Sequence, residues 1–239
     1  MTRVGVLGDG ATAADLVRDA GGEAVVGDEA LDSDADVLAA LGEDALLDAL
    51  AAAPGAPVLP VGAGDEYGGV TRDDLPDALA ALAGGDYEVD ERPTLAVGAG
   101  ERTVRALADV MLVTDEPARI SEYAVATRGR DVDAVRADGV VVATPAGSHG
   151  YAGDANGPLL SADADALAVV PVAPFRVERV QWVLDAPATV TVVREEADVS
   201  LLVDGRDRGF AAPHDPVELD WGEPFPVAVV AASRGVGFE

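Results

Sequence analysis

The chain contains no cysteine among its 239 residues, and only 4% of its residues are aromatic. Without cysteine, neither a disulfide bond nor a thiolate metal site can form. The sequence also lacks an apolar run of about 18 residues, the length that a membrane-spanning helix needs. A basic, apolar N-terminal segment of the secretory kind is missing too. These absences predict a soluble, cytoplasmic protein that does not bind a membrane.

Lysine is absent as well, so all 16 basic residues are arginine, and they face 44 acidic residues, which gives a net charge of −28. Carboxylates at this density repel one another in ordinary buffer, whereas molar salt shortens the Debye length to about 3 Å. A GC-rich genome explains the missing lysine but not the acidic excess. We therefore expect a halophilic protein from a high-salt cytoplasm. Nucleic acid is an unexpected partner, because no basic patch is present to neutralise phosphates.

The first 85 residues alternate short apolar runs with amphipathic stretches rich in Ala and Leu. Periodicity and turn signals predict strands at residues 3–7, 24–26, 36–40 and 57–61, and helices at 12–20, 44–53 and 73–83. Strands that alternate with helices are typical of a parallel α/β sheet.

After Tyr87 the pattern changes to repeated β-branched runs separated by turns such as Asp204-Gly205. The expected strands are 94–97, 110–113, 124–127, 140–143, 168–172, 181–184, 189–193, 200–203 and 227–232. Such spacing predicts an all-β, antiparallel domain. We expect an α/β nucleotide-binding domain at 1–88 and a β-rich domain for NAD binding and oligomerisation at 89–220. Residues 221–239 form a C-terminal strand that can return to the first domain.

The 138–158 loop is the most informative segment: Asp138-Gly139, an apolar run, Thr144-Pro145-Ala146-Gly147-Ser148-His149-Gly150-Tyr151, and then Asn156-Gly157-Pro158. A loop of small residues presents backbone N–H groups, hydroxyls and one aromatic face to a ligand. Those groups suit a nucleotide.

This loop resembles that of the NAD kinase family, which reads roughly D-G-(apolar)-T-P-T-G-S-T-A-Y followed by G-G-P. Weaker resemblances follow the family order. Residues 41–45 are similar to G-G-D-G-T, 57–64 with Tyr67-Gly68-Gly69 to G-V-N-x-G, Gly85-Asp86-Tyr87 with Arg92 to G-x-Y-x-x-x-x-R, 106–109 to A-L-N-E, and Asp204-Gly205 to a late D-G turn.

The resemblance implies an NAD kinase-like fold and phosphoryl transfer from ATP to the 2′-hydroxyl of NAD, with Mg²⁺ offsetting phosphate charge. Glu43 aligns with the family's presumed base, and sliding the alignment by one residue puts Asp44 there instead. NAD(H) and ATP are the implied partners, and a homodimer or homotetramer is the implied assembly. The residues implied to bind the nucleotides are Gly42, Asp109, Thr144, Gly147, Ser148, His149 and Tyr151. We expect no metal ligand set made by the chain alone.

Several positions of the family pattern, both glycines and polar residues, are changed here. Leu41 and Asp44 replace glycines, Gly62 and Ala108 replace asparagines, and Ala146 replaces a threonine. Three interpretations stay open at this point: a working NAD kinase, a catalytically degenerate nucleotide-binding paralogue, and a phosphotransferase with another acceptor. The sequence leaves open ATP or polyphosphate as donor, and NAD or NADH as acceptor.

Two other patterns are interpreted as structural. Gly8-Asp9-Gly10 resembles a phosphate turn, but its place after the first strand favours a plain strand-to-helix turn. Asp163 and Asp165 resemble a metal pair, and in this composition we expect them to be surface carboxylates.

Overall fold

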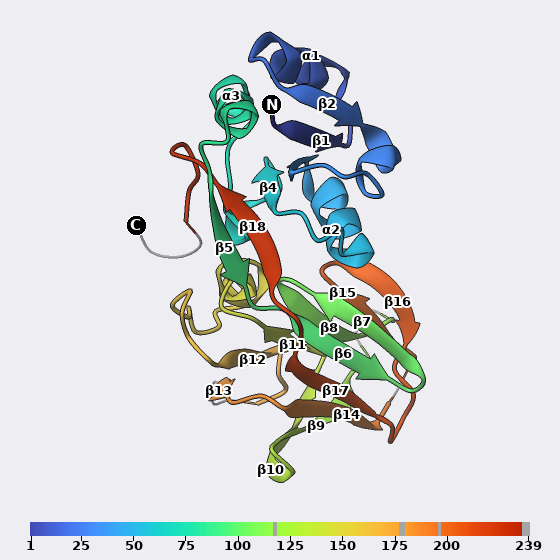
Figure 1. The fold of residues 1–239 in the computed structure, drawn as a ribbon. Coiled ribbons are helices and arrows are strands. Elements are labelled where there is room, and N and C mark those ends of the chain that lie inside the picture. Colours follow the sequence, from blue (N-terminus) through green and yellow to red (C-terminus); the bar gives the residue numbers. More distant parts are fainter. Residues whose placement is uncertain (117–118, 177–179, 196, 236–239) are drawn as a thin grey trace. The chain divides into compact units, whose positions relative to one another are not determined.

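The computed structural model describes residues 1–116, 119–176, 180–195 and 197–235. It divides the chain into two compact units: Met1–Arg92 with Pro224–Glu239, and Pro93–Glu223. The sequence placed these boundaries at 88 and 220. The structure puts them a few residues later, because strand β5 (Glu88–Arg92) pairs with β18 (Phe225–Val229) in the first unit (Figure 1).

The first unit contains one six-stranded sheet with the order β2-β1-β3-β4-β18-β5. Its strands are β1 (Arg3–Leu7), β2 (Glu23–Val26), β3 (Val37–Leu41), β4 (Val58–Val61), β5 and β18. All neighbours pair in parallel except β18 and β5. The central strands β3 and β4 are apolar and almost entirely buried, as strands covered on both faces must be.

Three helices pack on this sheet: α1 (Ala11–Asp19), α2 (Glu43–Ala52) and α3 (Leu75–Gly84). Short 3₁₀ turns lie at η1 (Gly27–Ala30) and η2 (Asp65–Tyr67). Helix α2 buries Leu46, Leu47 and Leu50 at helical spacing and ends where Ala53 takes a left-handed conformation before Pro54-Gly55. No helix in the described ranges is long and apolar enough to cross a membrane.

The second unit is made of two six-stranded antiparallel sheets, β10-β9-β14-β17-β6-β7 and β13-β12-β11-β8-β15-β16. The strands are β6 (Leu95–Ala99), β7 (Arg102–Ala106), β8 (Asp109–Thr114), β9 (Ser121–Thr127), β10 (Arg130–Ala137), β11 (Gly139–Ala143), β12 (Leu167–Val172), β13 (Trp182–Leu184), β14 (Ala188–Arg194), β15 (Val199–Val203), β16 (Arg206–Phe210) and β17 (Pro216–Trp221). Between β11 and β12 lie η3 (Gly147–His149) and the short helix α4 (Tyr151–Asp154).

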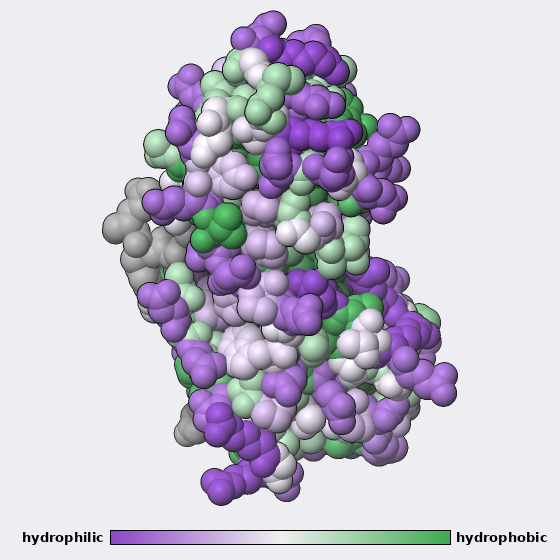
Figure 2. All heavy atoms as spheres, in the orientation of Figure 1, coloured by the Kyte–Doolittle hydropathy of each residue, from purple (hydrophilic) through white to green (hydrophobic). Residues whose placement is uncertain are grey.

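One apolar core joins the two sheets of the second unit. Leu95 and Tyr123 from the first sheet and Leu112 and Val140 from the second belong to the same buried cluster. Burial raises the pKa of Tyr123, whose hydroxyl lies 3.0 Å from that of Thr114 inside this core. The predicted fold class, a parallel α/β unit and an antiparallel β unit, is confirmed. Hydrophilic residues cover much of the visible face, as the acidic composition requires (Figure 2).

Candidate functional site

The candidate residues fall in both units, and the first group lies where the parallel strands of the first unit end. Gly8, Gly42 and Gly62 directly follow β1, β3 and β4, and each has a positive φ, of 89°, 96° and 58°. Only glycine adopts such angles without strain. Parallel strands end at a common side of the sheet, which we call the carboxyl edge, and open α/β sheets bind their ligands there.

Glu43 and Asp44, the expected catalytic pair, are the first two residues of α2 at this edge. The Gly42 N–H donates to the Val61 carbonyl at 2.8 Å, which fixes the turn between β3 and the helix. Both carboxylate side chains are exposed. The structure thus brings Gly42, Glu43 and Asp44 together, and two negative charges stand at a helix N-terminus, where the dipole favours them.

Tyr67 orients Glu43, a role that the sequence analysis did not find. The Tyr67 hydroxyl donates to Glu43 Oε1 at 3.2 Å, although the tyrosine itself is only 3% exposed. Its carbonyl accepts a bond from Arg92 Nη1 at 3.4 Å. The Tyr67-Gly68-Gly69 pattern indicates a turn in the sequence. Only the fold shows that this turn places the Tyr67 side chain beside Glu43.

The second group is the 138–158 loop of the second unit. Thr144 is completely buried, and its hydroxyl donates to the Leu107 carbonyl at 2.9 Å and accepts the Gly147 N–H at 3.2 Å. A Cβ on Gly147 would lie 2.1 Å from the Ala108 carbonyl oxygen, so only glycine fits at this position. The loop therefore lies directly against the backbone of residues 107–108.

Ser148 and His149 close the other side of this loop. The Ser148 hydroxyl donates to the Pro145 carbonyl at 2.7 Å and accepts the Leu160 N–H at 2.9 Å, and the side chain is completely buried. His149 Nε2 lies 3.0 Å from the Leu160 carbonyl oxygen. In this structure the two hydroxyls expected to bind the dinucleotide, those of Thr144 and Ser148, bond to the protein backbone.

Asp204 holds the 107–109 turn, against which the 138–158 loop packs. Its carboxylate, 6% exposed, accepts the N–H groups of Leu107, Ala108 and Asp109 at 2.8, 2.7 and 3.0 Å. The Ala108 carbonyl in turn accepts the Thr144 N–H at 2.9 Å. The D-G turn therefore fixes the segment that includes Asp109, and that segment fixes the loop. The D-G turn is visible in the sequence, but its contacts with residues 107–109 are visible only in the fold.

Tyr151 differs from the buried loop residues because it is 45% exposed. It lines a cavity of about 410 Å³ together with Asn156, Val170, Pro174 and Gln181. An exposed aromatic ring beside apolar and amide side chains offers a planar ligand a stacking face and hydrogen-bond partners. This cavity lies entirely within the second unit.

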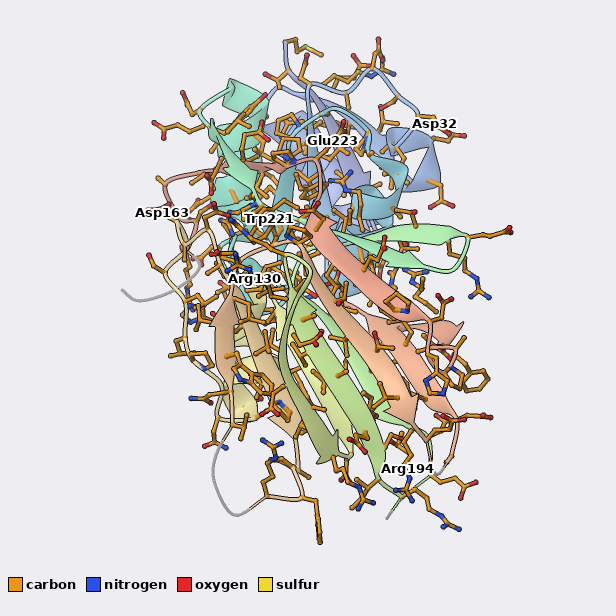
Figure 3. The ribbon with its side chains drawn as sticks, turned by 90° about the horizontal axis from the view of Figure 1, so that it is seen from below. Asp32, Arg130, Asp163, Arg194, Trp221 and Glu223 are labelled. Carbon is orange, nitrogen blue, oxygen red and sulfur yellow. The ribbon has the colours of Figure 1, made fainter. Side chains whose placement is uncertain are left out.

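The remaining expectations concern metal and surface residues. Within the described residues, no group of three or more His, Asp or Glu side chains is arranged to hold a metal ion. Asp163 is exposed at the margin of the molecule, as expected for a surface carboxylate (Figure 3). Gly10 caps α1, and a Cβ there would lie 2.6 Å from Val6 Cγ1, so the Gly8-Asp9-Gly10 segment is a tight strand-to-helix turn.

Comparison with known proteins places these features in a family. The ATP-NAD kinase C-terminal domain family matches residues 107–228. The NAD kinase of Geotalea daltonii is 32% identical over 202 residues, which cover 79% of this chain and 71% of that protein. The NAD kinase of Geobacter metallireducens is 38% identical over 144 residues, 57% of this chain and 51% of that protein. The matching region thus spans about half the length of several such relatives.

Two solved structures show the same fold. An NAD kinase from Archaeoglobus fulgidus in complex with ATP superposes with a TM-score of 0.77 at 22% identity, over 97% of this chain and 94% of that one. Yeast NADH kinase complexed with NADH gives a TM-score of 0.76 at 14% identity, over 97% and 84%. From the family match, the relatives and the motif order, the chain belongs to the NAD kinase family.

Proposed function

We propose that this chain transfers the γ-phosphoryl group of ATP to the 2′-hydroxyl of NAD and so forms NADP. The observation that carries the proposal is Glu43, an exposed carboxylate at the carboxyl edge that a buried tyrosine hydroxyl orients. Membership of the NAD kinase family supports it, and so does the ATP bound to the Archaeoglobus fulgidus relative.

In the proposed reaction, the NAD 2′-oxygen forms a bond with the γ-phosphorus while the bond from that phosphorus to ADP breaks. Glu43 accepts the hydroxyl proton, and ADP leaves with the bonding electron pair. Glu43 is longer than the family's aspartate by one methylene, a bit over 1 Å, and a misplacement of about 1 Å can cost on the order of 10²-fold in rate. The hydrogen bond from Tyr67 offsets this loss, because it fixes where the longer side chain ends.

Mg²⁺ is part of the proposal as an ion that arrives with ATP. Proteins usually hold Mg²⁺ through one or two carboxylates together with substrate phosphates, not in a dedicated cage. The donors at the start of α2 fit that pattern: Glu43 and Asp44 are two exposed carboxylates. When bound, the ion would neutralise charge on the phosphates, and Asp44 is the side chain that we expect to hold it.

For the dinucleotide, we propose that some residues of the second unit hold the loop in place and others contact the ligand. Thr144, Gly147 and Ser148 hold the loop, since their side chains or backbone are committed to internal contacts. Direct contact then comes from the loop backbone and from the side chains of Asp109, His149 and Tyr151. The Tyr151 cavity has the size and lining for one planar ring of the dinucleotide.

The test is NADP formation by purified protein in molar KCl with NAD, ATP and Mg²⁺. We expect Glu43→Gln to lower turnover by roughly 10²-fold or more, the usual contribution of a general base, and to leave NAD binding unchanged. Glu29→Gln, an exposed glutamate of the same unit, is the matched control and should not affect turnover. Asp44→Asn decides between the two carboxylates.

Three outcomes count against the proposal or revise it. Full turnover by Glu43→Gln with loss in Asp44→Asn would move the base to Asp44. Full turnover by both variants would remove both carboxylates from the role of base. A folded parent that binds NAD but forms no NADP would contradict the kinase and favour a nucleotide-binding protein without activity.

The charge of −28 supports a further part of the proposal, function in a high-salt cytoplasm. We expect the thermal unfolding midpoint to rise between 0.1 M and 2 M KCl by roughly 5 °C or more, or about 2 kcal/mol for a chain of this size. Equal midpoints would contradict halophilic adaptation. The homodimer or homotetramer implied by the family resemblance is also proposed, and a solution mass of 24.2 kDa, that of one chain, would contradict it.

A further inference from the structure

Arg72 lies at the carboxyl edge of the first unit, although it is ten residues beyond Gly62 in sequence. The segment after β4 folds back on the strand: the Gly62 N–H donates to the Val70 carbonyl at 2.8 Å, and the Val70 N–H donates to Pro60 at 2.9 Å. The Thr71 hydroxyl then bonds to Asp74 Oδ2 at 2.6 Å. The backbone of Arg72 is therefore fixed beside the end of β4.

The side chain of Arg72 crosses the ends of two strands. A Cβ built on Gly62 would lie 3.0 Å from Arg72 Cγ and 3.3 Å from its Nε, and a Cβ on Gly42 would lie 3.6 Å from Nη2. The aliphatic part thus covers Gly62, and the guanidinium extends toward Gly42. In the family pattern that the sequence resembles, Gly62 replaces an asparagine, so an arginine from elsewhere in the chain lies where that side chain is missing.

The charge on Arg72 is available to a ligand. Within the described part of the chain, its side chain forms no ion pair and no hydrogen bond, and it is exposed. Other arginines of the described residues, among them Arg18 and Arg92, pair with carboxylates. The chain contains 44 acidic residues, and two of them, Asp73 and Asp74, directly follow Arg72. The guanidinium nevertheless extends along the carboxyl edge toward Gly42. Its planar fork suits a phosphate group, which it can bind through two parallel N–H bonds.

We propose that Arg72 is a phosphate-binding residue of the carboxyl edge: its guanidinium binds a phosphate group of a nucleotide beside Gly42, which adds no side chain there. This deepens the proposed function and rests on it for the kind of ligand. The phosphate belongs either to the donor nucleotide or to the dinucleotide.

Calorimetry in 1 M KCl tests the proposal with ADP, NAD and adenosine as probes. We expect Arg72→Gln to weaken binding of one phosphate-bearing probe by about 10-fold or more, the loss of hydrogen bonds to a charged group, and to leave adenosine binding unchanged. Weaker ADP binding assigns the phosphate to the donor, and weaker NAD binding assigns it to the dinucleotide. Arg72→Lys, which keeps the charge without the fork, should lie between Arg72→Gln and the parent.

Arg18→Gln is the matched control, because Arg18 is an exposed arginine of the same unit on α1. Equal affinities of parent and Arg72→Gln for both nucleotides would overturn the proposal, as would a parent that binds neither or an equal loss in Arg18→Gln. Failure of the proposed function is distinguishable: weaker ADP or NAD binding with no NADP from the parent removes the kinase and keeps the phosphate contact. If the parent forms NADP and Arg72→Gln has unchanged KM values, the kinase proposal is kept and the phosphate contact is removed.

Discussion

The turn after β3 in the first unit and the loop after β11 in the second both align with an NAD kinase motif, but they are held in different ways. In the loop, the polar residues are buried and bond to backbone groups: Thr144 to Leu107, and Ser148 to Pro145 and Leu160. At the turn, the polar residues are exposed at the carboxyl edge. Thr144, Gly147 and Ser148 of the family pattern are thus kept where they hold backbone in place, and the pattern varies where side chains are exposed at the carboxyl edge.

This difference changes what the departures from the family pattern mean. Replacing a buried hydroxyl of the loop would leave backbone groups without partners, which is costly. Replacing glycines by Leu41 and Asp44 at the turn leaves the local fold intact, and neighbours from the 62–72 segment supply new contacts. Tyr67 orients the altered carboxylate, and Arg72 covers the vacated position at Gly62. An altered motif at an exposed edge is therefore weak support for lost activity.

The largest effect on stability is expected from Asp204→Asn, which changes the buried network that holds the loop of the second unit. The carboxylate accepts three backbone N–H bonds, whereas an amide has one oxygen and places N–H donors against them. Asp204 has a φ of +46°, which asparagine tolerates, so the change tests the charge and not the backbone. We expect a loss of about 2–4 kcal/mol in the free energy of unfolding, measured with urea at fixed KCl.

Asp207→Asn is the control for that measurement. Asp207 lies in the same hairpin, is exposed and accepts a single N–H bond, from Gly209 at 2.7 Å. It should cost less than about 1 kcal/mol. If Asp204→Asn proves no more costly than Asp207→Asn, the loop does not depend on this buried network, and the contrast between the two regions fails.

The fold was predictable where burial dictates the pattern. Apolar runs revealed the central strands, for example β3, β11 and β12. The strands that the sequence analysis did not propose are β5, β7, β10, β16 and β17, and all except β17 are edge strands of their sheets. Edge strands such as β16, with the sequence RDRGF, carry charged residues because one side faces water. The composition of β16 resembles that of a loop, so apolar periodicity does not reveal it, whereas the edge strands β2 and β13 contain apolar residues and were predicted.

The site was predictable only as a set of motifs. Matching residues to a family pattern located Glu43 and the loop, but a pattern does not state which way a hydroxyl points. Thr144 and Ser148 were expected to bind ligand, and the structure gives both hydroxyls backbone partners. Tyr67 and Arg72 come to the edge through the fold of the 62–72 segment, so their roles depend on three-dimensional neighbours that no local spacing encodes.

Tyr67→Phe changes the carboxyl edge of the first unit, and we expect it to affect stability less than Asp204→Asn does. The ring stays in its buried position and the hydrogen bond from its hydroxyl to Glu43 is lost, so we expect a cost of about 0.5–1.5 kcal/mol. Because Glu43 then lacks its orienting partner, kcat for NADP formation should fall by roughly 10-fold while KM values change little. Steady-state kinetics in molar KCl measures this change in kcat.

Tyr87→Phe is the control. The Tyr87 hydroxyl, whose pKa is raised by burial, bonds only weakly to the Asp36 carbonyl at 3.4 Å. Equal kcat values for the two variants would mean that Glu43 does not need the Tyr67 hydroxyl as an orienting partner.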